Sequence, residues 1–151
     1  MTEDMTTITD PFDRKHYHHW IEDRVRFSDL DPLGHVNNNA ISQYFENARA
    51  LFYMRLTPLW PRGDKLFVLA RVEVNYRHEL HMPAHLKIGT GVRKIGTTSL
   101  TLTNVLYSDR VGIAYGQSVS VLIDKKKRRP VPIDDELRSL IQDILDTPND
   151  E

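Results

Sequence analysis

The side chains best suited to chemistry lie in one short stretch near the start of the chain. It brings together two acids, a turn, a histidine and three amides: Asp29, Asp31, Pro32, Gly34, His35, Asn37, Asn38 and Asn39. Because Asp31 precedes a proline, its backbone is expected to be extended, and one of the asparagines is suited to cap a following helix. A helix that begins there directs unpaired N–H groups and a partial positive charge towards the loop. This combination suits acyl transfer, in which the helix end polarises a carbonyl and a carboxylate attacks it or activates water.

The neighbouring polar side chains allow several interpretations. His35 could orient a water or transfer a proton, and an asparagine could hold that water or the carbonyl. The same residues are also typical of a structural turn followed by a helix N-cap. A cation site formed by Asp29, Asp31 and His35 would lack a second histidine from the same element, so no metal is expected. The remaining histidines are expected in a lead-in to a strand and in a loop: His16, His18 and His19, then His78, His81 and His85.

Length and composition narrow the classes of protein. The chain has 151 residues, of which 40% are hydrophobic and 27% charged, as expected for one globular domain over residues 1–151. A net charge of −1 gives no attraction to nucleic acid or to a membrane surface. The absence of cysteine excludes disulfides, thiolate metal sites and a cysteine nucleophile. The chain shows neither an apolar leader nor a run of about 18 apolar residues, so a cytoplasmic location is expected.

The hydrophobic pattern predicts the elements that must position the loop. Residues 1–15 are polar and are expected to form a loose tail. A helix with one broad apolar face begins near Asn38 and continues to about Arg55. Alternating or β-branched residues predict five strands, over 20–27, 67–76, 86–95, 99–107 and 111–124. Asp134 and Asp135 open a short amphipathic helix over 133–146.

These elements predict an α+β fold. The last four strands follow one another with short connections, so most should pair antiparallel. The long helix must cover one face of the sheet. A single sheet with one covering helix leaves long edges, which favours association of subunits along a strand.

A family resemblance rests on the loop and on the strands that follow it. FSDLDPLGHVNN at 27–38 and YFENAR at 44–49 resemble the signature of the hotdog-fold thioesterases, and most closely that of the 4-hydroxybenzoyl-CoA and acyl-CoA thioesterase group. Further matches are ARVEVNY at 70–76, TSL at 98–100 and SVLID at 120–124. The resemblance covers roughly residues 20–145. Its motif is more specific for the fold than for the substrate.

The resemblance implies a five-stranded antiparallel sheet wrapped around a long central helix. Such proteins form dimers with a continuous sheet, often paired into tetramers, with the site at the subunit interface. Asp31 matches the family's catalytic aspartate, a nucleophile or general base, and the backbone N–H near Asn38 matches the donor that polarises the carbonyl. One branch has a catalytic histidine at the position of Asn38. The acyl-carrier-protein thioesterases have an asparagine at the position of Leu33, while Asp31 and His35 match.

We therefore expect a homo-oligomeric thioesterase that hydrolyses acyl-CoA, with no cofactor and no nucleic-acid or membrane partner. The expected catalytic residues are Asp31, His35 and Asn38, and the expected substrate-binding residues are Asn37, Tyr44, Arg93, Lys94, Thr98 and Ser99. The basic run at 125–129 could also hold CoA phosphates, although it equally fits a solvated hairpin tip. The alternatives are an acyl-carrier-protein thioesterase and a non-catalytic acyl-thioester binder. An enoyl-CoA hydratase fits the motif poorly.

Overall fold

The computed structural model describes residues 8–149, which contain two α-helices and a sheet. The helices are α1 (Asn38–Leu56) and α2 (Asp135–Asp146). The strands are β1 (His19–Arg24), β2 (Lys65–Tyr76), β3 (His85–Ile95), β4 (Ser99–Ser108), β5 (Val111–Asp124) and the two-residue β6 (Arg129–Pro130). Three short 3-10 helices, η1 (Arg14–His16), η2 (Phe27–Asp29) and η3 (Thr57–Leu59), lie in the connections. None of the helices in this described part has the length and apolar run needed to cross a membrane.

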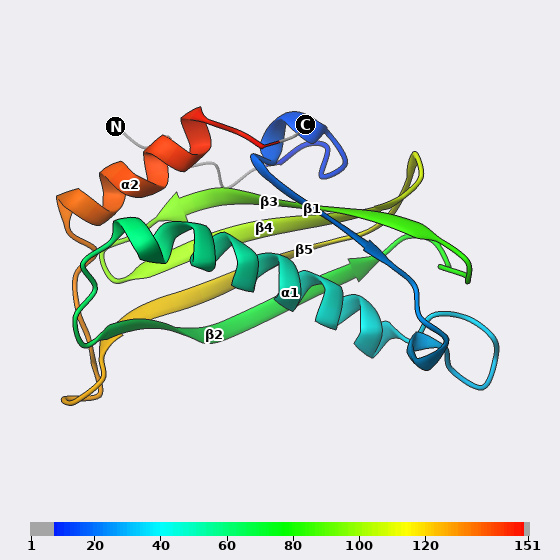
Figure 1. Ribbon diagram of the computed structural model, residues 1–151, viewed down its shortest axis with the longest axis horizontal. Helices are drawn as coiled ribbons and strands as arrows, with labels where there is room; N and C mark the ends of the chain where they lie inside the picture. Colours follow the sequence, from blue (N-terminus) through cyan, green and yellow to red (C-terminus); the bar gives the residue numbers. More distant parts are fainter. Residues whose placement is uncertain (1–7, 150–151) are drawn as a thin grey trace.

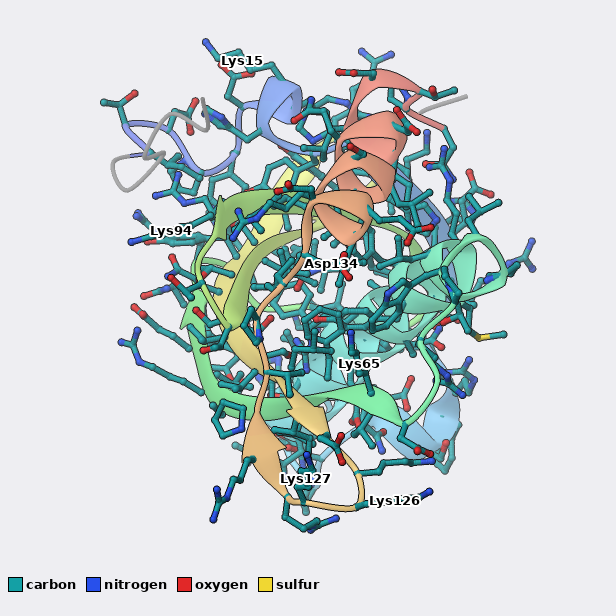
Figure 2. All side chains as sticks on the ribbon, turned by 90° about the vertical axis from the view of Figure 1, so that its left-hand side faces the viewer. Lys15, Lys65, Lys94, Lys126, Lys127 and Asp134 are labelled. Carbon is teal, nitrogen blue, oxygen red and sulfur yellow. The ribbon has the colours of Figure 1, made fainter. Side chains whose placement is uncertain are left out.

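The sheet has the order β1-β3-β4-β5-β2, every pair is antiparallel, and β6 adds to β5. It curls around α1, which lies along its concave face (Figure 1). The view along the helix shows the strands forming an open ring around it (Figure 2). The predicted α+β hotdog architecture is thus confirmed, with the short β6 as an addition to the five expected strands.

The concave face is filled by the apolar side of α1. Phe45 and Phe52 are each 1% exposed and belong to two core clusters, one at each end of the helix. Gly116 on β5 lies under the Phe45 ring, and a Cβ added there would come 2.5 Å from the backbone oxygen of Glu73 on β2 and 3.5 Å from that ring. Close packing of this kind makes the position of α1 on the sheet sensitive to single side chains.

The opposite face of the sheet carries a smaller aromatic cluster formed by Tyr17, Trp20, Val105 and Tyr107. Phe12 packs against this cluster and contacts the rings of Tyr107 and Tyr115 edge to face. The expectation of a loose tail over 1–15 therefore needs correction for residues 8–15, because aromatic burial holds this segment on the sheet. Residues 1–7 lie outside the described part of the chain.

The two edges of the sheet differ. At the β1 edge, the side chain of Asn149 accepts a hydrogen bond from Trp20 N at 2.6 Å and donates to Trp20 O at 3.1 Å. This amide therefore occupies the positions that a neighbouring strand would use. At the β2 edge, Leu69, Val72 and Tyr76 are 53%, 43% and 46% exposed. The exposed edge is thus β2.

Candidate active site

The loop between β1 and α1 is held in shape by its own backbone. Leu30 and Val36 form a β-bridge, and Asp31 N donates to His35 O at 2.8 Å. Gly34 closes the turn with φ at +89°, a value that side chains other than glycine adopt with strain. The expected turn is therefore present and closes between Asp31 and His35.

The Asp31 carboxylate lies inside this turn. Its Oδ1 accepts hydrogen bonds from Leu33 N at 2.9 Å and from His35 N at 3.2 Å. Among the residues that the structure describes, no ion pair or hydrogen bond engages Oδ2, and the residue is partly exposed. One oxygen therefore anchors the side chain while the other is available to a ligand.

The amides after the loop start α1 as expected. Asn37 is the N-cap residue, and its side chain accepts a hydrogen bond from Asn39 N at 2.9 Å. Ala40 N donates to Asn37 O at 2.9 Å. Within the described chain, the N–H of Asn38 has no hydrogen bond, and it lies at the positive end of the helix dipole. This N–H is consequently a candidate donor to an oxyanion.

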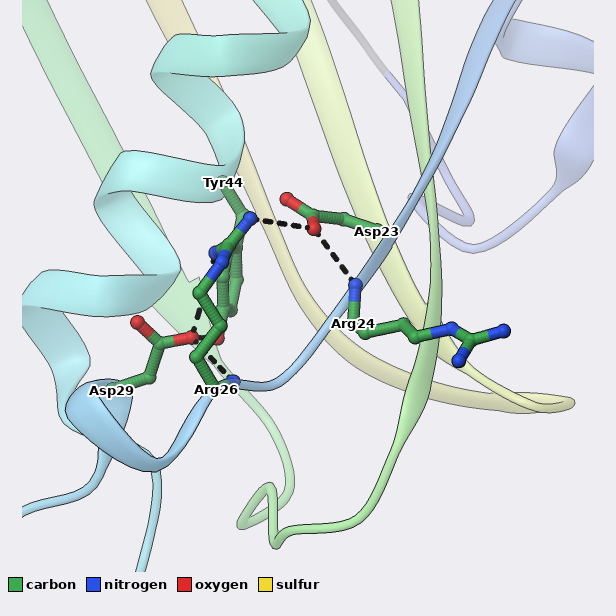
Figure 3. A network of polar contacts seen from close by, with 5 residues as sticks. All are labelled: Asp23, Arg24, Arg26, Asp29 and Tyr44. Carbon is green, nitrogen blue, oxygen red and sulfur yellow. Dashed lines mark hydrogen bonds and ion pairs between the residues drawn. The ribbon is translucent and has the colours of Figure 1, made fainter.

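The second acid of the motif, Asp29, has a structural role. It is buried, and its Oδ2 accepts hydrogen bonds from the Tyr44 hydroxyl at 2.6 Å and from Arg26 N at 2.9 Å (Figure 3). Burial, together with the Asp29 carboxylate, raises the pKa of Tyr44 well above its usual range, so Tyr44 stays protonated as the donor. Tyr44, predicted to bind substrate, is only 2% exposed and ties α1 to the loop.

Three of the predicted substrate-binding residues lie far along the sheet from Asp31. Lys94, Thr98 and Ser99 are at the β3–β4 hairpin, beside the end of α1 opposite to the loop (Figures 1 and 2). A helix of 19 residues separates the two ends by about 28 Å. One subunit therefore does not bring these residues to the loop.

Arg93, the other predicted basic contact, is 7% exposed. It lines a cavity of about 350 Å³ together with Glu73, Arg77 and Thr103. Gly116 on β5 faces Phe45 of α1. Its neighbours Tyr115 and Gln117 point to the other face of the sheet, because successive residues of a strand face opposite ways. Both line this cavity, which therefore lies on the face turned away from α1. Arg93 is thus on the opposite side of the sheet from the helix.

A second hollow, of about 410 Å³, lies beside the exposed side of α1 and is lined by Asp23, Arg26, Gln43, Tyr44, Glu46, Asn47 and Ala50. Asp31 lines neither this hollow nor the one around Arg93. Both are open to solvent. Neither of these two hollows therefore provides an acyl pocket next to Asp31.

Sequence reasoning missed the residues that surround His35. Glu79 and His81, from the connection between β2 and β3, approach it: His35 Nδ1 lies 3.4 Å from Glu79 Oε2, and His81 Nε2 lies 3.5 Å from the same oxygen. The predicted loop location of His81 is correct. Its contact with His35 gives no signal in the sequence, because it depends on a long-range bond from Val36 N to Leu80 O at 2.8 Å.

Comparison with known proteins places these features in a family. The model of the thioesterase-like superfamily matches residues 25–141, which include the loop, α1 and all the long strands after it. The chain belongs to the thioesterase-like superfamily. The match begins at Val25, four residues before Asp29.

Solved structures agree with this assignment. A predicted thioesterase from Bacillus stearothermophilus is 30% identical, with a TM-score of 0.76 over 87% of this chain and 98% of that one. A thioesterase from Thermus thermophilus, complexed with coenzyme A and Zn, is 32% identical, with a TM-score of 0.75 over 85% of this chain and 95% of that one.

Among curated proteins, the uncharacterized protein YsmA of Bacillus subtilis is 31% identical over 78 residues. The match covers 52% of this chain and 53% of YsmA, so it spans about half of that relative's length. Membership of the thioesterase-like superfamily rests on the family model, and the fold on the solved structures.

Proposed function

We propose that the protein hydrolyses an acyl-CoA thioester to the free acid and CoA, with Asp31 as nucleophile or general base. The observation that carries this proposal is the Asp31 carboxylate, held by two backbone amides through Oδ1 with Oδ2 unengaged, in the loop that leads into α1. Fixing the side chain in this way reduces the cost of orienting it towards a thioester carbonyl. The family and its thioesterase members support this reaction class.

In this mechanism the N–H of Asn38 donates a hydrogen bond to the thioester oxygen, where negative charge develops. Its position at the start of α1 supports the role, since helix N-termini stabilise anions. The Asp31 carboxylate then attacks the carbonyl carbon and expels the CoA thiolate, leaving an anhydride that water hydrolyses to the free acid and Asp31. Alternatively, it removes a proton from a water that attacks the carbon and displaces the thiolate, which takes up a proton as CoA leaves. His35, whose backbone N–H holds Asp31, would position this carboxylate and orient the water.

The CoA part of the substrate is supported by the Thermus thermophilus relative, which is complexed with coenzyme A. In the described part of the chain, the hydrogen bonds of the Asp31 side chain come from backbone N–H groups, and no lysine or arginine of the same subunit contacts it. We propose that a second copy of the chain supplies the phosphate contacts and completes the acyl pocket. Asn37, Lys94, Thr98 and Ser99 remain candidate substrate contacts in such an assembly.

Antiparallel pairing of two β2 edges gives a geometry for this assembly. The first residue of β2 lies next to the basic turn at 125–128, since Lys125 N donates to Asp64 O at 2.7 Å. The last residue of β2 leads into the β2–β3 connection, which contacts the Asp31 loop through the bond from Val36 N to Leu80 O. A two-fold axis through β2 would therefore bring the partner's basic turn to the Asp31 end of this subunit. The exposed apolar residues on β2 support an interface there.

The decisive experiment is a thiol-release assay over short, long and aromatic acyl-CoAs and acyl carrier protein thioesters. Asp31→Asn should lower the rate by about a thousandfold or more. The asparagine oxygen can still accept from Leu33 N and His35 N, so the loop should keep its structure. Asp143→Asn, the same exchange at an exposed position of α2, is the matched control. Saturable acyl-CoA binding without release of free thiol would contradict the proposed hydrolysis and would indicate that the protein only binds acyl-CoA.

A further inference from the structure

Three donor side chains next to the catalytic loop meet at one point. They are His35 from the loop, and Glu79 and His81 from the connection between β2 and β3. One ligand atom from each lies within 4.8 Å of the other two, and the rings of His35 and His81 have centroids 4.8 Å apart. This group combines the loop with a segment more than 40 residues later in the chain.

The backbone fixes this meeting point. Val36 N donates to Leu80 O at 2.8 Å, and the side chains of both residues are buried in the core, at 5% and 2% exposure. In extended chain, successive side chains point to opposite sides. The neighbours of these two residues, His35 on one segment and Glu79 and His81 on the other, are therefore directed out of the core towards one another.

The polar atoms of these three side chains lie close together without forming good hydrogen bonds to one another. His35 Nδ1 has almost no solvent contact and forms no hydrogen bond, although Glu79 Oε2 lies 3.4 Å away. When Nδ1 is unprotonated, both atoms present lone pairs, and their approach is then favourable only with a cation between them. The second histidine directs Nε2 to the same oxygen at 3.5 Å.

Two of the three distances between ligand atoms match the edge of a tetrahedral cation site, and the third, between the two histidines, is at most 4.8 Å. Nitrogen and oxygen ligands about 2.0–2.1 Å from Zn²⁺ lie roughly 3.3 Å apart in a tetrahedron. The two distances to Glu79 Oε2 are 3.4 and 3.5 Å. Two imidazoles and one carboxylate form a donor set that suits Zn²⁺ and leaves a fourth position for water. An ion can reach the site from solvent, because the side chains of Glu79 and His81 are 69% and 58% exposed.

We propose that His35, Glu79 and His81 form a binding site for a divalent transition-metal cation of the zinc type. Such an ion would join the catalytic loop to the β2–β3 connection and restrain the backbone that holds Asp31. Asp31 is not among the ligands, so the site is distinct from the proposed catalytic carboxylate, although it shares His35 with the loop that holds Asp31. From the sequence we expected no metal, because we weighed Asp29, Asp31 and His35 as one set and placed His81 in a loop. The combination of His35 with Glu79 and His81 was not considered.

The test uses the full chain without a histidine tag, freed of metal by a chelator and titrated with Zn²⁺ alone in a calorimeter. We expect one Zn²⁺ per chain and a higher melting temperature with Zn²⁺ present. His81→Ala and Glu79→Gln should each weaken binding by more than about tenfold and remove the thermal shift. Both side chains are largely exposed, so these variants should fold. Co²⁺ should give the absorption of a tetrahedral site in the unaltered protein and lose it in His81→Ala.

His78→Ala is the matched control, because this exposed histidine lies three residues from His81 and outside the group. It should bind Zn²⁺ like the unaltered protein. Asp31→Asn should also bind Zn²⁺ normally, which separates this site from the proposed hydrolysis. Binding weaker than about 1 mM, or equal binding by His81→Ala, would overturn the proposal and leave an ion pair of protonated histidines with Glu79. An equal loss in His78→Ala would overturn it too.

Discussion

The hydroxyl of Tyr44 donates a 2.6 Å hydrogen bond to Asp29 Oδ2 and so joins the second turn of α1 to the loop that carries Asp31. Both residues are buried, and Arg26 N donates to the same carboxylate oxygen. The two acids of the loop thus differ in role. Asp29 holds the loop against α1, and Asp31 keeps one carboxylate oxygen available to a ligand.

Tyr44→Phe should destabilise the protein by about 1.5–3 kcal/mol, because it removes a buried hydrogen bond to a charged acceptor. Urea unfolding followed by circular dichroism measures this change. Tyr76→Phe, at a position that is 46% exposed on β2, should have little effect. Equal stability of Tyr44→Phe and the unaltered protein would show that the bond contributes nothing to folding.

Gly34→Ala should lower thioester hydrolysis by a larger factor than Gly63→Ala. Both glycines have positive φ, at +89° and +57°, and a Cβ at either meets no atom within 4 Å. Each substitution should therefore cost about 1–2 kcal/mol through backbone conformation alone. Only Gly34 lies in the turn around Asp31, so initial rates and unfolding free energies measured together should separate the two variants. A similar loss of rate in both would contradict the role of this turn.

His19 should make the protein less stable in mild acid. It is 6% exposed, and its pKa is lowered by burial and by the neighbouring charge of Arg55. A lowered pKa means that the unfolded chain takes up a proton first, so stability falls as the pH drops below the ordinary value of about 6.5 and levels off below the folded-state pKa. The contribution of one proton is at most about 1.4 kcal/mol per pH unit.

Unfolding free energies of the unaltered protein and His19→Gln, measured between about pH 8 and pH 5, test this effect. The variant should show a shallower decrease, while His78→Gln, at an exposed position, should follow the unaltered protein. Parallel curves for all three proteins would exclude His19 as the source of acid sensitivity.

Val72→Lys combined with Leu69→Lys should weaken self-association. Both side chains lie on the exposed β2 edge, and a two-fold interface would bring like charges together. Light scattering coupled to size exclusion should show a smaller assembly, with a parallel decrease in thioester hydrolysis. Val111→Lys, equally exposed but on β5, is the control. An unchanged mass would place the interface elsewhere.

Much of the fold could be predicted from local pattern. The apolar periodicity of α1, its Asn37 cap and the alternation in the strands depend on neighbours a few residues apart, so the sequence displays them directly. The turn at Gly34 is equally local. The end of β1 was predicted too late, at Phe27 instead of Arg24, because Phe27 begins a 3-10 helix that places Asp29 beneath α1.

The sequence by itself therefore determined the order of the elements, the turn around Asp31 and the amide-rich start of α1. Only the tertiary structure decided which side chains surround them. It buried Asp29 against Tyr44, joined His35 to Glu79 and His81, packed Phe12 on the sheet, and put Lys94 at the far end of α1. These contacts join segments distant in sequence, and they follow from how a curled sheet closes around a helix, which no local pattern encodes.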